Sequence, residues 1–262
     1  MEKTHKEQVR ELLNSIETGE TAPVAYINAE NYTQHNPIAA DGLEGFGEVL
    51  AGLKDYPEDA RVNVVRIFED GDYVFSHTEY NFFGEKIGFD IFRFEDDKIV
   101  EHWDNMQQKP VENNPSGHSM TDGPTTAFNS ERTEENKVVA EEFVRDILMG
   151  ENLSLIEEYF DRGNLIQHNP LVGDGLEAMQ RAFVEMQDAE MTMEYHRICK
   201  VLGEGNFVLS VSEGLYGEGG GVPTVFYDLF RVENYKIAEH WDVIEAVPSK
   251  EDSKNSNGKA HF

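Results

Sequence analysis

DIFRFEDDKIVEHWD at residues 90–104 recurs as DLFRVENYKIAEHWD at residues 228–242. Two shorter blocks repeat in the same order: QHNP at 34–37 returns at 167–170, and DGLE at 41–44 returns at 174–177. Three matched blocks in one order indicate a duplicated structural unit. The sequence therefore predicts two homologous domains in tandem.

Each copy shows helical periodicity first and strand-like runs afterwards. In the first copy, apolar residues recur at helical spacing over 4–18 and 42–53, with a short helix expected to begin at Thr21. Four β-rich runs follow at 61–69, 72–80, 86–95 and 98–107. The second copy repeats this, with helices expected near 132–149, 152–159 and 175–187 and strands near 191–203, 206–214, 223–232 and 235–245.

Helices followed by an antiparallel meander define an α+β layout. We expect two tandem cone-shaped domains, each with about three N-terminal helices packed on a curved antiparallel sheet and with a small-molecule pocket at its mouth. Domain 1 is expected at residues 1–107 and domain 2 at residues 131–247. Residues 108–130 have the composition of a linker, and residues 248–262 that of a disordered tail.

Composition limits the partners that we expect. The chain has 51 acidic and 22 basic residues, a formal net charge of −29, which disfavours nucleic acid and anionic membranes. This charge fits either simple solubility or adaptation to a salty cytoplasm. The sequence has no apolar run of about 18 residues and no apolar signal-peptide core, so we expect a cytoplasmic location. A single cysteine, Cys199, excludes an intrachain disulfide.

The motifs Y-x-Q-H-N-P, D-G-x-E-G and D-x-F-R-F-x-x-x-K-I-x-E-H-W-D resemble those of the SnoaL-like polyketide cyclase and aldol-condensation family. That family belongs to the superfamily of ketosteroid isomerase, scytalone dehydratase and nuclear transport factor, and the resemblance spans both copies. It implies a nuclear-transport-factor-like fold and chemistry without a cofactor. The implied reactions are aldol cyclisation, isomerisation or dehydration of a small hydrophobic carbonyl-type molecule.

Asp90 and Asp228 are the first catalytic candidates. Each alternates with aromatic residues on one face of a predicted strand, and burial among them favours a neutral carboxyl. Such a group can donate to a developing oxyanion or shuttle a proton. The resemblance also puts His35 and His168 at the pocket, so we predict the catalytic pairs Asp90–His35 and Asp228–His168. The alternatives are a structural aspartate and a histidine that locks the turn before a helix.

The duplicated His-Trp-Asp triplets supply the substrate-binding candidates, namely His102, Trp103, His240 and Trp241. Adjacent strand residues point to opposite faces, so either the tryptophan or the His–Asp pair lines the pocket. His77 is a further candidate, and Val211 replaces it in the second copy; its alternative is an exposed strand histidine. No short H-x-x-x-H or C-x-x-C spacing occurs, so we expect no metal.

Three classes of function remain open. The leading one is a cofactor-independent enzyme, the second is a non-catalytic binder of a small hydrophobic molecule, and the third is an assembly module. In the third class the two domains would pair sheet to sheet as an intramolecular pseudo-dimer, and the chain would then be monomeric.

Overall fold

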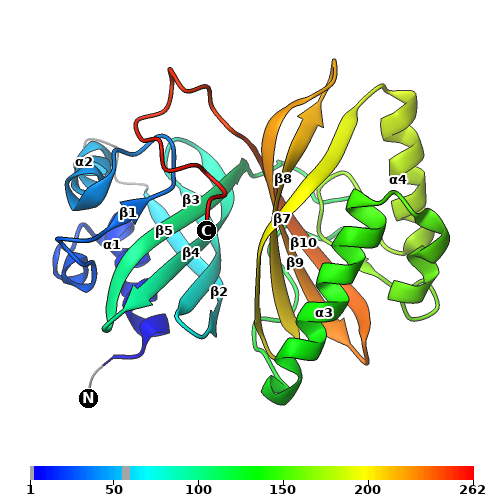
Figure 1. Ribbon diagram of the computed structural model, residues 1–262, viewed down its shortest axis with the longest axis horizontal. Helices are drawn as coiled ribbons and strands as arrows, with labels where there is room; N and C mark the ends of the chain where they lie inside the picture. The colour runs from blue at the N-terminus through cyan, green and yellow to red at the C-terminus, as the bar shows by residue number, and fades with distance from the viewer. Residues whose placement is uncertain (1–2, 55–59) are drawn as a thin grey trace. The chain divides into compact units, whose positions relative to one another are not determined.

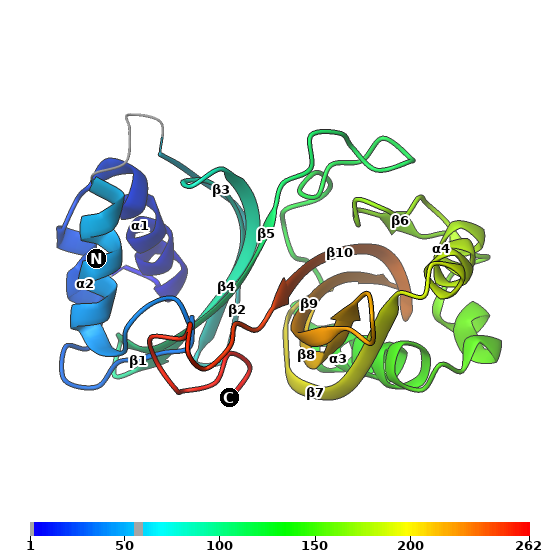
Figure 2. The same cartoon turned by 90° about the horizontal axis from the view of Figure 1, so that it is seen from above.

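Two compact units make up the computed structural model, which describes residues 3–54 and 60–262. Unit 1 contains Met1–Lys109 and Val247–His261, and unit 2 contains Pro110–Ala246 with Phe262. Each unit is a five-stranded open sheet with helices on one side (Figures 1 and 2). The predicted α+β class with two homologous halves is therefore confirmed.

Unit 1 begins with α1 (His5–Thr18), the 3-10 helix η1 (Ala22–Tyr26) and α2 (Gly42–Lys54). A capping box between Thr4 and Glu7 starts α1, and Gly19 in the left-handed region ends it. The strands are β1 (Thr33–Gln34), β2 (Arg61–Asp70), β3 (Tyr73–Asn81), β4 (Glu85–Glu95) and β5 (Lys98–Gln108), in the sheet order β1-β5-β4-β3-β2.

Unit 2 repeats this order. Its helical segments are η2 (Ser130–Arg132), α3 (Thr133–Phe143) with its π-helical continuation η3 (Val144–Met149), η4 (Leu153–Tyr159) and α4 (Leu176–Asp188). The strands are β6 (Ile166–Gln167), β7 (Thr192–Glu204), β8 (Phe207–Gly217), β9 (Val222–Glu233) and β10 (Lys236–Ala246), in the sheet order β6-β10-β9-β8-β7.

Each unit buries its own core between helices and sheet. In unit 1, Val9 and Leu12 of α1 pack with Phe92 and Phe94 of β4. In unit 2, Phe143 of α3 meets the rings of Phe160 and Phe230 edge to face. Because both cores lie on the helical side of the sheet, inward-facing polar residues on β4, β5, β9 and β10 are held among apolar neighbours.

The sheets are mixed rather than purely antiparallel. Thr33 and Gln34 of the QHNP region pair in parallel with Glu101 and His102 of β5, and Ile166 and Gln167 pair likewise with β10. The sequence indicated no strand here, since two paired residues are too short to show alternation. The pairing fixes QHNP directly against the His-Trp-Asp triplet.

The segments expected to be linker and tail are held by hydrogen bonds. Residues 254–261, the unit-1 clasp, bond to unit 1: Asn255 Nδ2 donates to the Asn36 and Ala39 carbonyls, and Asn257 Nδ2 donates to the Gln34 carbonyl. Residues 113–122, the unit-2 clasp, bond to unit 2, where Asn114 Nδ2 donates to the Gln167 and Val172 carbonyls. A composition rich in Asn, Ser and Gly suggests disorder, but the same amides can bond backbone groups.

None of the helices in the described part of the chain combines the length and apolarity that a membrane span needs.

Candidate active sites

Two corresponding clusters of polar residues lie on the inward faces of the two sheets. In unit 1, Asp90 of β4 is opposite Asp104 of β5, and His102 is two residues away on the same face. We call Asp90, His102 and Asp104 site 1. The same register in unit 2 brings together Asp228, His240 and Asp242, which we call site 2. Within each site, one imidazole nitrogen and two carboxylate oxygens all lie within 4.8 Å of one another.

A histidine–aspartate pair is central to each site. His240 Nε2 lies 3.0 Å from Asp228 Oδ1, and His102 Nε2 lies 3.3 Å from Asp90 Oδ1. On its other side His240 Nδ1 lies 3.0 Å from Gln167 Oε1. That oxygen also accepts two backbone N–H groups, so it is an acceptor and His240 Nδ1 must donate. The remaining nitrogen, Nε2, therefore faces the Asp228 carboxylate, and either group can hold a proton placed between them.

The QHNP motif explains the position of the other carboxylate. Asn169 Nδ2 donates to Asp242 Oδ2 at 2.6 Å, and Asn36 Nδ2 donates to Asp104 Oδ2 at the same distance. In unit 1, Gln34 Oε1 again faces His102 Nδ1 at 3.0 Å. Glutamine orients the histidine and asparagine orients the aspartate, so the motif positions both site residues of the last strand.

A tyrosine hydroxyl completes each cluster. Tyr80 Oη donates to Asp90 Oδ2 at 2.5 Å, and Tyr195 Oη lies 3.3 Å from both carboxylate oxygens of Asp228. Burial raises the pKa of both tyrosines, and the neighbouring aspartates raise it further. Both phenols therefore stay protonated and act as donors to the carboxylates. No motif in the sequence marks these two tyrosines as site residues.

The two tyrosines come from different strands. Tyr80 of β3 is paired with Val62 of β2, whereas in unit 2 the corresponding pair is Gly214 of β8 with Tyr195 of β7. In unit 2 the tyrosine thus lies on the neighbouring strand, at the position paired with the one that it has in unit 1. In both units its hydroxyl reaches the site aspartate. A sequence alignment of the two halves does not reveal that the two tyrosines are equivalent. Bulges shift the register of β2 and β7, so which residues are paired is known only from the structure.

Site 2 forms the polar end of an apolar cavity. The cavity has a volume of about 370 Å³, within the range of small-molecule pockets. Asp228, His240 and Asp242 contribute to its lining. Its apolar walls come from both helices and strands, among them Phe143, Phe160, Met179, Phe183, Met186 and Phe230.

The environment of site 2 raises the pKa of both His240 and Asp242. Burial raises the pKa of Asp242, and the Asp228 carboxylate adds to this while His240 opposes it. Burial alone would lower the pKa of His240, but the hydrogen bond to Asp228 and the charges of Asp242 and Asp228 outweigh it and raise that pKa. Both groups therefore keep a proton to a higher pH than usual.

His35 and His168 do not lie beside the predicted aspartates. His35 stacks on Trp103 with ring centroids 4.5 Å apart, and His168 stacks on Trp241 at 4.6 Å. Strand alternation puts these tryptophans on the sheet face opposite His102 and His240. The predicted pairs Asp90–His35 and Asp228–His168 are thus corrected. Within QHNP, glutamine points to the site and the next residue, histidine, to the other side.

Other residues fix His35 and His168 in place. His35 Nε2 lies 2.9 Å from Glu101 Oε1, and its Nδ1 lies 2.8 Å from the Gly258 carbonyl. His168 Nε2 and Nδ1 make the matching contacts, each at 2.8 Å, with Glu239 Oε1 and the Ser119 carbonyl. These contacts join QHNP to the clasps, which agrees with the structural alternative weighed for this histidine.

The His–Asp pair, and not the tryptophan, faces the cavity of unit 2. Trp103 and Trp241 are fully buried and donate their indole N–H to the His261 and Asp122 carbonyls. His77 also differs from expectation, since it is neither exposed nor beside Asp90. It is buried, stacks on Phe89 at 4.2 Å and accepts from Arg66 Nη1.

Two carboxylates and an imidazole can ligate a metal, but in sites 1 and 2 several of these ligand atoms already make hydrogen bonds within the protein. In both, asparagine and glutamine amides already bond the aspartate and the histidine. A third cluster of ligand-type residues, His118, Asp122 and His168, lies outside these sites in unit 2.

Residues 9–102 match the family model described as SnoaL-like domain. The matched residues include Asp90 and His102, and unit 2 repeats the motifs and the strand order of this region. No curated protein sequence matches the chain.

Several solved structures resemble one part of the chain. TsrD from Streptomyces laurentii is 18% identical, covering 40% of this chain and 92% of its own, with a TM-score of 0.35. IdmH, a candidate polyketide cyclase from Streptomyces antibioticus, is 19% identical, covering 38% and 90%, with a TM-score of 0.34. A protein with a ketosteroid isomerase-like fold from Catenulispora acidiphila, solved with trimethylamine, is 19% identical, covering 38% and 85%, with a TM-score of 0.32.

Proposed function

We propose that this protein is a cofactor-independent enzyme that transfers a proton next to a carbonyl group. The reaction would be aldol cyclisation, isomerisation or dehydration of a small hydrophobic substrate. The observation that carries the proposal is the contact between His240 Nε2 and Asp228 Oδ1, 3.0 Å apart, at the polar end of an apolar cavity. An apolar cavity strengthens the electrostatic interactions inside it and excludes competing water.

The proposed base is the Asp228–His240 pair. Because Gln167 fixes the proton on His240 Nδ1, the pair can accept one further proton, and that proton can rest on either partner. The Tyr195 hydroxyl keeps the carboxylate oriented toward His240 without neutralising it. In the proposed step the C–H bond of the substrate breaks, its proton passes to this pair, and its electrons move toward the carbonyl oxygen.

The proposed stabiliser of that oxygen is Asp242. Its Oδ2 is held by Asn169, whereas its buried Oδ1 has no hydrogen-bond partner among the described residues. Its pKa is raised by burial, which favours a carboxyl group that still carries its proton. A neutral carboxyl that donates to a developing oxyanion lowers the barrier of enolate-forming reactions.

A general base can be tested without knowing the natural substrate. We would use a nitrobenzisoxazole, whose ring opens to a coloured cyanophenolate when a base removes one C–H proton. General-base catalysis is worth about 10²–10⁴-fold, so Asp228→Asn should lower kcat/KM by a factor in that range. Asp90→Asn makes the same change in unit 1 and measures the contribution of site 1.

The assay also separates the enzyme from a binder. Catalysis by the wild type that neither Asp228→Asn nor Asp90→Asn reduces would contradict the proposed base. If the probe bound to the wild type, as measured by fluorescence titration, but was not turned over, the non-catalytic binder would become the better account. All assays include a chelator, so that a contaminating metal cannot supply the activity.

A further inference from the structure

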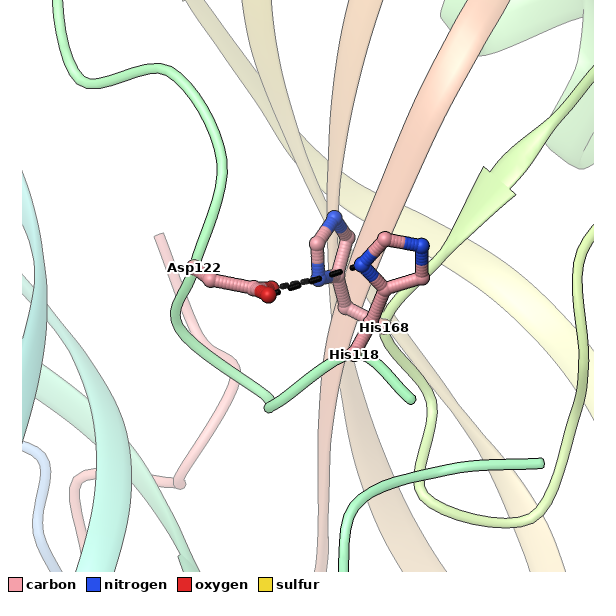
Figure 3. A group of neighbouring side chains, drawn as sticks. All are labelled: His118, Asp122 and His168. Carbon is pink, nitrogen blue, oxygen red and sulfur yellow. Dashed lines mark hydrogen bonds and ion pairs between the residues drawn. The ribbon is translucent and has the colours of Figure 1, made fainter. Parts of the chain in front are cut away.

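The unit-2 clasp brings a second histidine and a carboxylate to His168. His168 Nδ1 lies 2.7 Å from Asp122 Oδ1, and His118 Nδ1 lies 3.4 Å from Asp122 Oδ2. Figure 3 shows both imidazole rings directed at the same carboxylate. One ligand atom from each of the three residues lies within 4.8 Å of the other two. The cluster is on the Trp241 side of the sheet and is separate from site 2.

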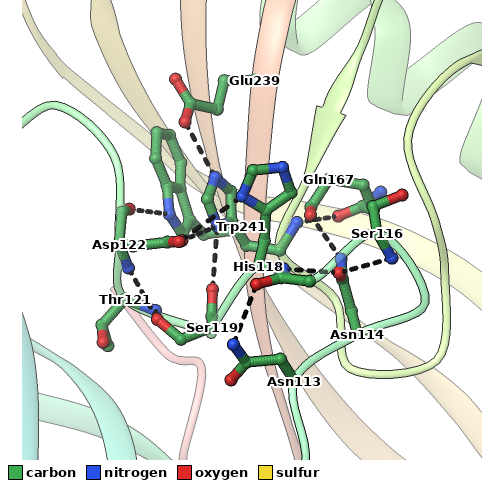
Figure 4. A network of polar contacts seen from close by, with 12 residues as sticks. Asn113, Asn114, Ser116, His118, Ser119, Thr121, Asp122, Gln167, Glu239 and Trp241 are labelled. Atoms are coloured by element: carbon green, nitrogen blue, oxygen red, sulfur yellow. Dashed lines mark hydrogen bonds and ion pairs between the residues drawn. The ribbon is translucent and has the colours of Figure 1, made fainter.

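The far nitrogen of each histidine already meets a carboxylate. His168 Nε2 lies 2.8 Å from Glu239 Oε1, and Arg231 Nε donates to the other oxygen of Glu239. His118 Nε2 lies 3.2 Å from Asp174 Oδ2. Metal-binding histidines in proteins commonly donate their outer N–H to a carboxylate in this way, which orients the ring and increases its basicity. Both rings have that arrangement and share the Asp122 carboxylate on their inner side. Figure 4 shows His118, Asp122 and Glu239 within one network of polar contacts.

Unit 1 contains the same framework without the ligands. His35 keeps its contacts with Glu101 and with the Gly258 carbonyl. Asn257 corresponds to His118, because each directly precedes the residue whose carbonyl meets the QHNP histidine. Asn257 hydrogen-bonds Asp41, and His118 contacts the matching Asp174. His261 takes the place of Asp122 as the backbone acceptor for the tryptophan. Among the residues that the structure describes, two histidines and a carboxylate therefore come together in this way in unit 2 and not in unit 1.

We propose that His118, Asp122 and His168 bind one Zn²⁺ ion, with the Asp122 carboxylate between the two Nδ1 atoms. Two imidazoles and a carboxylate suit zinc and leave one coordination position open. An ion has access from solvent, since the side chains of His118 and Asp122 are 31% and 46% exposed, while His168 is buried. To bind the ion, His168 Nδ1 must lose the proton that it directs at the Ser119 carbonyl and at Asp122, and the ion would take the place of that proton. This proposal does not depend on the proposed function.

Calorimetric titration of Zn²⁺ into chelator-treated full-length protein tests the site. We expect one equivalent bound by the wild type and at least a tenfold weaker affinity in His118→Asn. That variant places in unit 2 the residue that unit 1 already has, and it should therefore fold. Asp122→Asn should weaken binding similarly. The control is His196→Asn, because His196 also pairs with a carboxylate, Glu194, at an exposed site, and it should bind like the wild type.

Cobalt substitution reports the ligands directly. Co²⁺ bound to the wild type should give visible absorption bands that change in His118→Asn and stay in His196→Asn. The proposal is overturned if the wild type binds no Zn²⁺ at micromolar concentration. It is also overturned if His118→Asn binds with unchanged affinity, which would move the ion to site 1 or site 2, or if His196→Asn loses binding equally.

Discussion

At the scale of single residues, the four letters QHNP serve both faces of the sheet. Gln167 and Asn169 reach the site residues His240 and Asp242, and His168 between them reaches Trp241 and Glu239. One short motif thus sets the tautomer of the site histidine and fixes the clasp on the other side. A substitution in this motif is expected to disturb both faces of the sheet. Substitutions of residues that contact only one face therefore give results that are easier to interpret.

The first residue-scale prediction concerns pH. The pKa of His240 is raised above 6.5 in the folded protein, so its bound proton stabilises unit 2 fully below about pH 6.5. That contribution is lost as the pH rises through the raised pKa. The pKa of Asp242 is also raised, so its contribution has the same sign, but its loss begins already above about pH 3.8. Urea unfolding of unit 2 should therefore show lower stability at pH 9 than at pH 6.

Each unit has one tryptophan, so the measurement can be made unit by unit. In a Trp103→Phe background the fluorescence of Trp241 follows unit 2 alone. His240→Gln in that background should flatten the dependence between pH 6 and pH 9. Stability that rises with pH in the parent variant would contradict the prediction.

The second residue-scale prediction concerns the hydroxyl on Asp228. Tyr195→Phe removes a buried donor from a carboxylate, which should cost about 1–3 kcal/mol of unfolding free energy and lower the proposed activity. Tyr216→Phe is the matched control, since both tyrosines line the cavity and contact Phe226, Tyr195 by stacking and Tyr216 edge to face. Equal losses of stability and activity in the two variants would show that the hydrogen bond to Asp228 contributes nothing beyond an ordinary tyrosine hydroxyl in the cavity.

At the scale of elements, the exchange of tyrosine between β7 and β8 depends on a glycine. A Cβ at Gly214 would lie 1.7 Å from the Glu194 carbonyl oxygen, a backbone atom that cannot swing away. The strand pair approaches closely beside the bulge at Tyr195/Arg197. Only glycine fits there, so the tyrosine of unit 2 must come from the opposite strand.

Gly214→Ala should therefore destabilise unit 2 by about 3 kcal/mol, as expected for overpacking against backbone. Gly47→Ala is the contrasting control. A Cβ there meets nothing within 4 Å, and alanine favours the helix α2 by up to about 1 kcal/mol. Thermal unfolding of both variants checks the opposite signs. A Gly214→Ala variant as stable as the wild type would mean that β7 and β8 separate at this point without cost.

The elements differ in how far the sequence predicts them. Long periodic runs such as β4 and β5 lie close to the expected ranges, and alternation put His102 and Asp104 on one face of β5. That this face is also the face of Asp90 follows only from the register between the two strands. The two-residue strand β1 has no period, so the side on which His35 lies could not be predicted. Tyr80 and Tyr195 required the register across a bulged ladder. His118 lay in a segment whose polar composition suggested no structure.

At the scale of the whole molecule, the two units exchange the segments that follow their last strands. The chain after β5 belongs to unit 2, and the chain after β10 returns to unit 1. Each clasp offers one carbonyl to the QHNP histidine and another to the tryptophan indole. The clasps also differ: Lys259, buried with its Nζ 3.8 Å from Asp104 Oδ1, takes the position that Met120 has in unit 2. The two sites are therefore unequal in charge.

This exchange predicts that unit 1 depends on the end of the chain. Truncation after Ala246 should destabilise unit 1 by about 3 kcal/mol or more, because it uncovers the Trp103 indole and leaves its N–H without the His261 carbonyl. Unit 2 loses only Phe262, keeps its own clasp and should change little. Hydrogen exchange read by mass spectrometry would show faster exchange around β1 and β5 and unchanged protection in β6 and β10.

A peptide of residues 247–262 added in trans supplies the control for this truncation. If the clasp acts through its own contacts, the peptide should restore protection around His35 and Trp103, and a Lys259→Met peptide should restore the fold while changing the charge at site 1. Unchanged protection in the truncated chain would mean that the clasp adds no stability. Loss of protection in both units would mean that the ends of the chain stabilise the molecule as a whole, so that the exchanged segments couple the units.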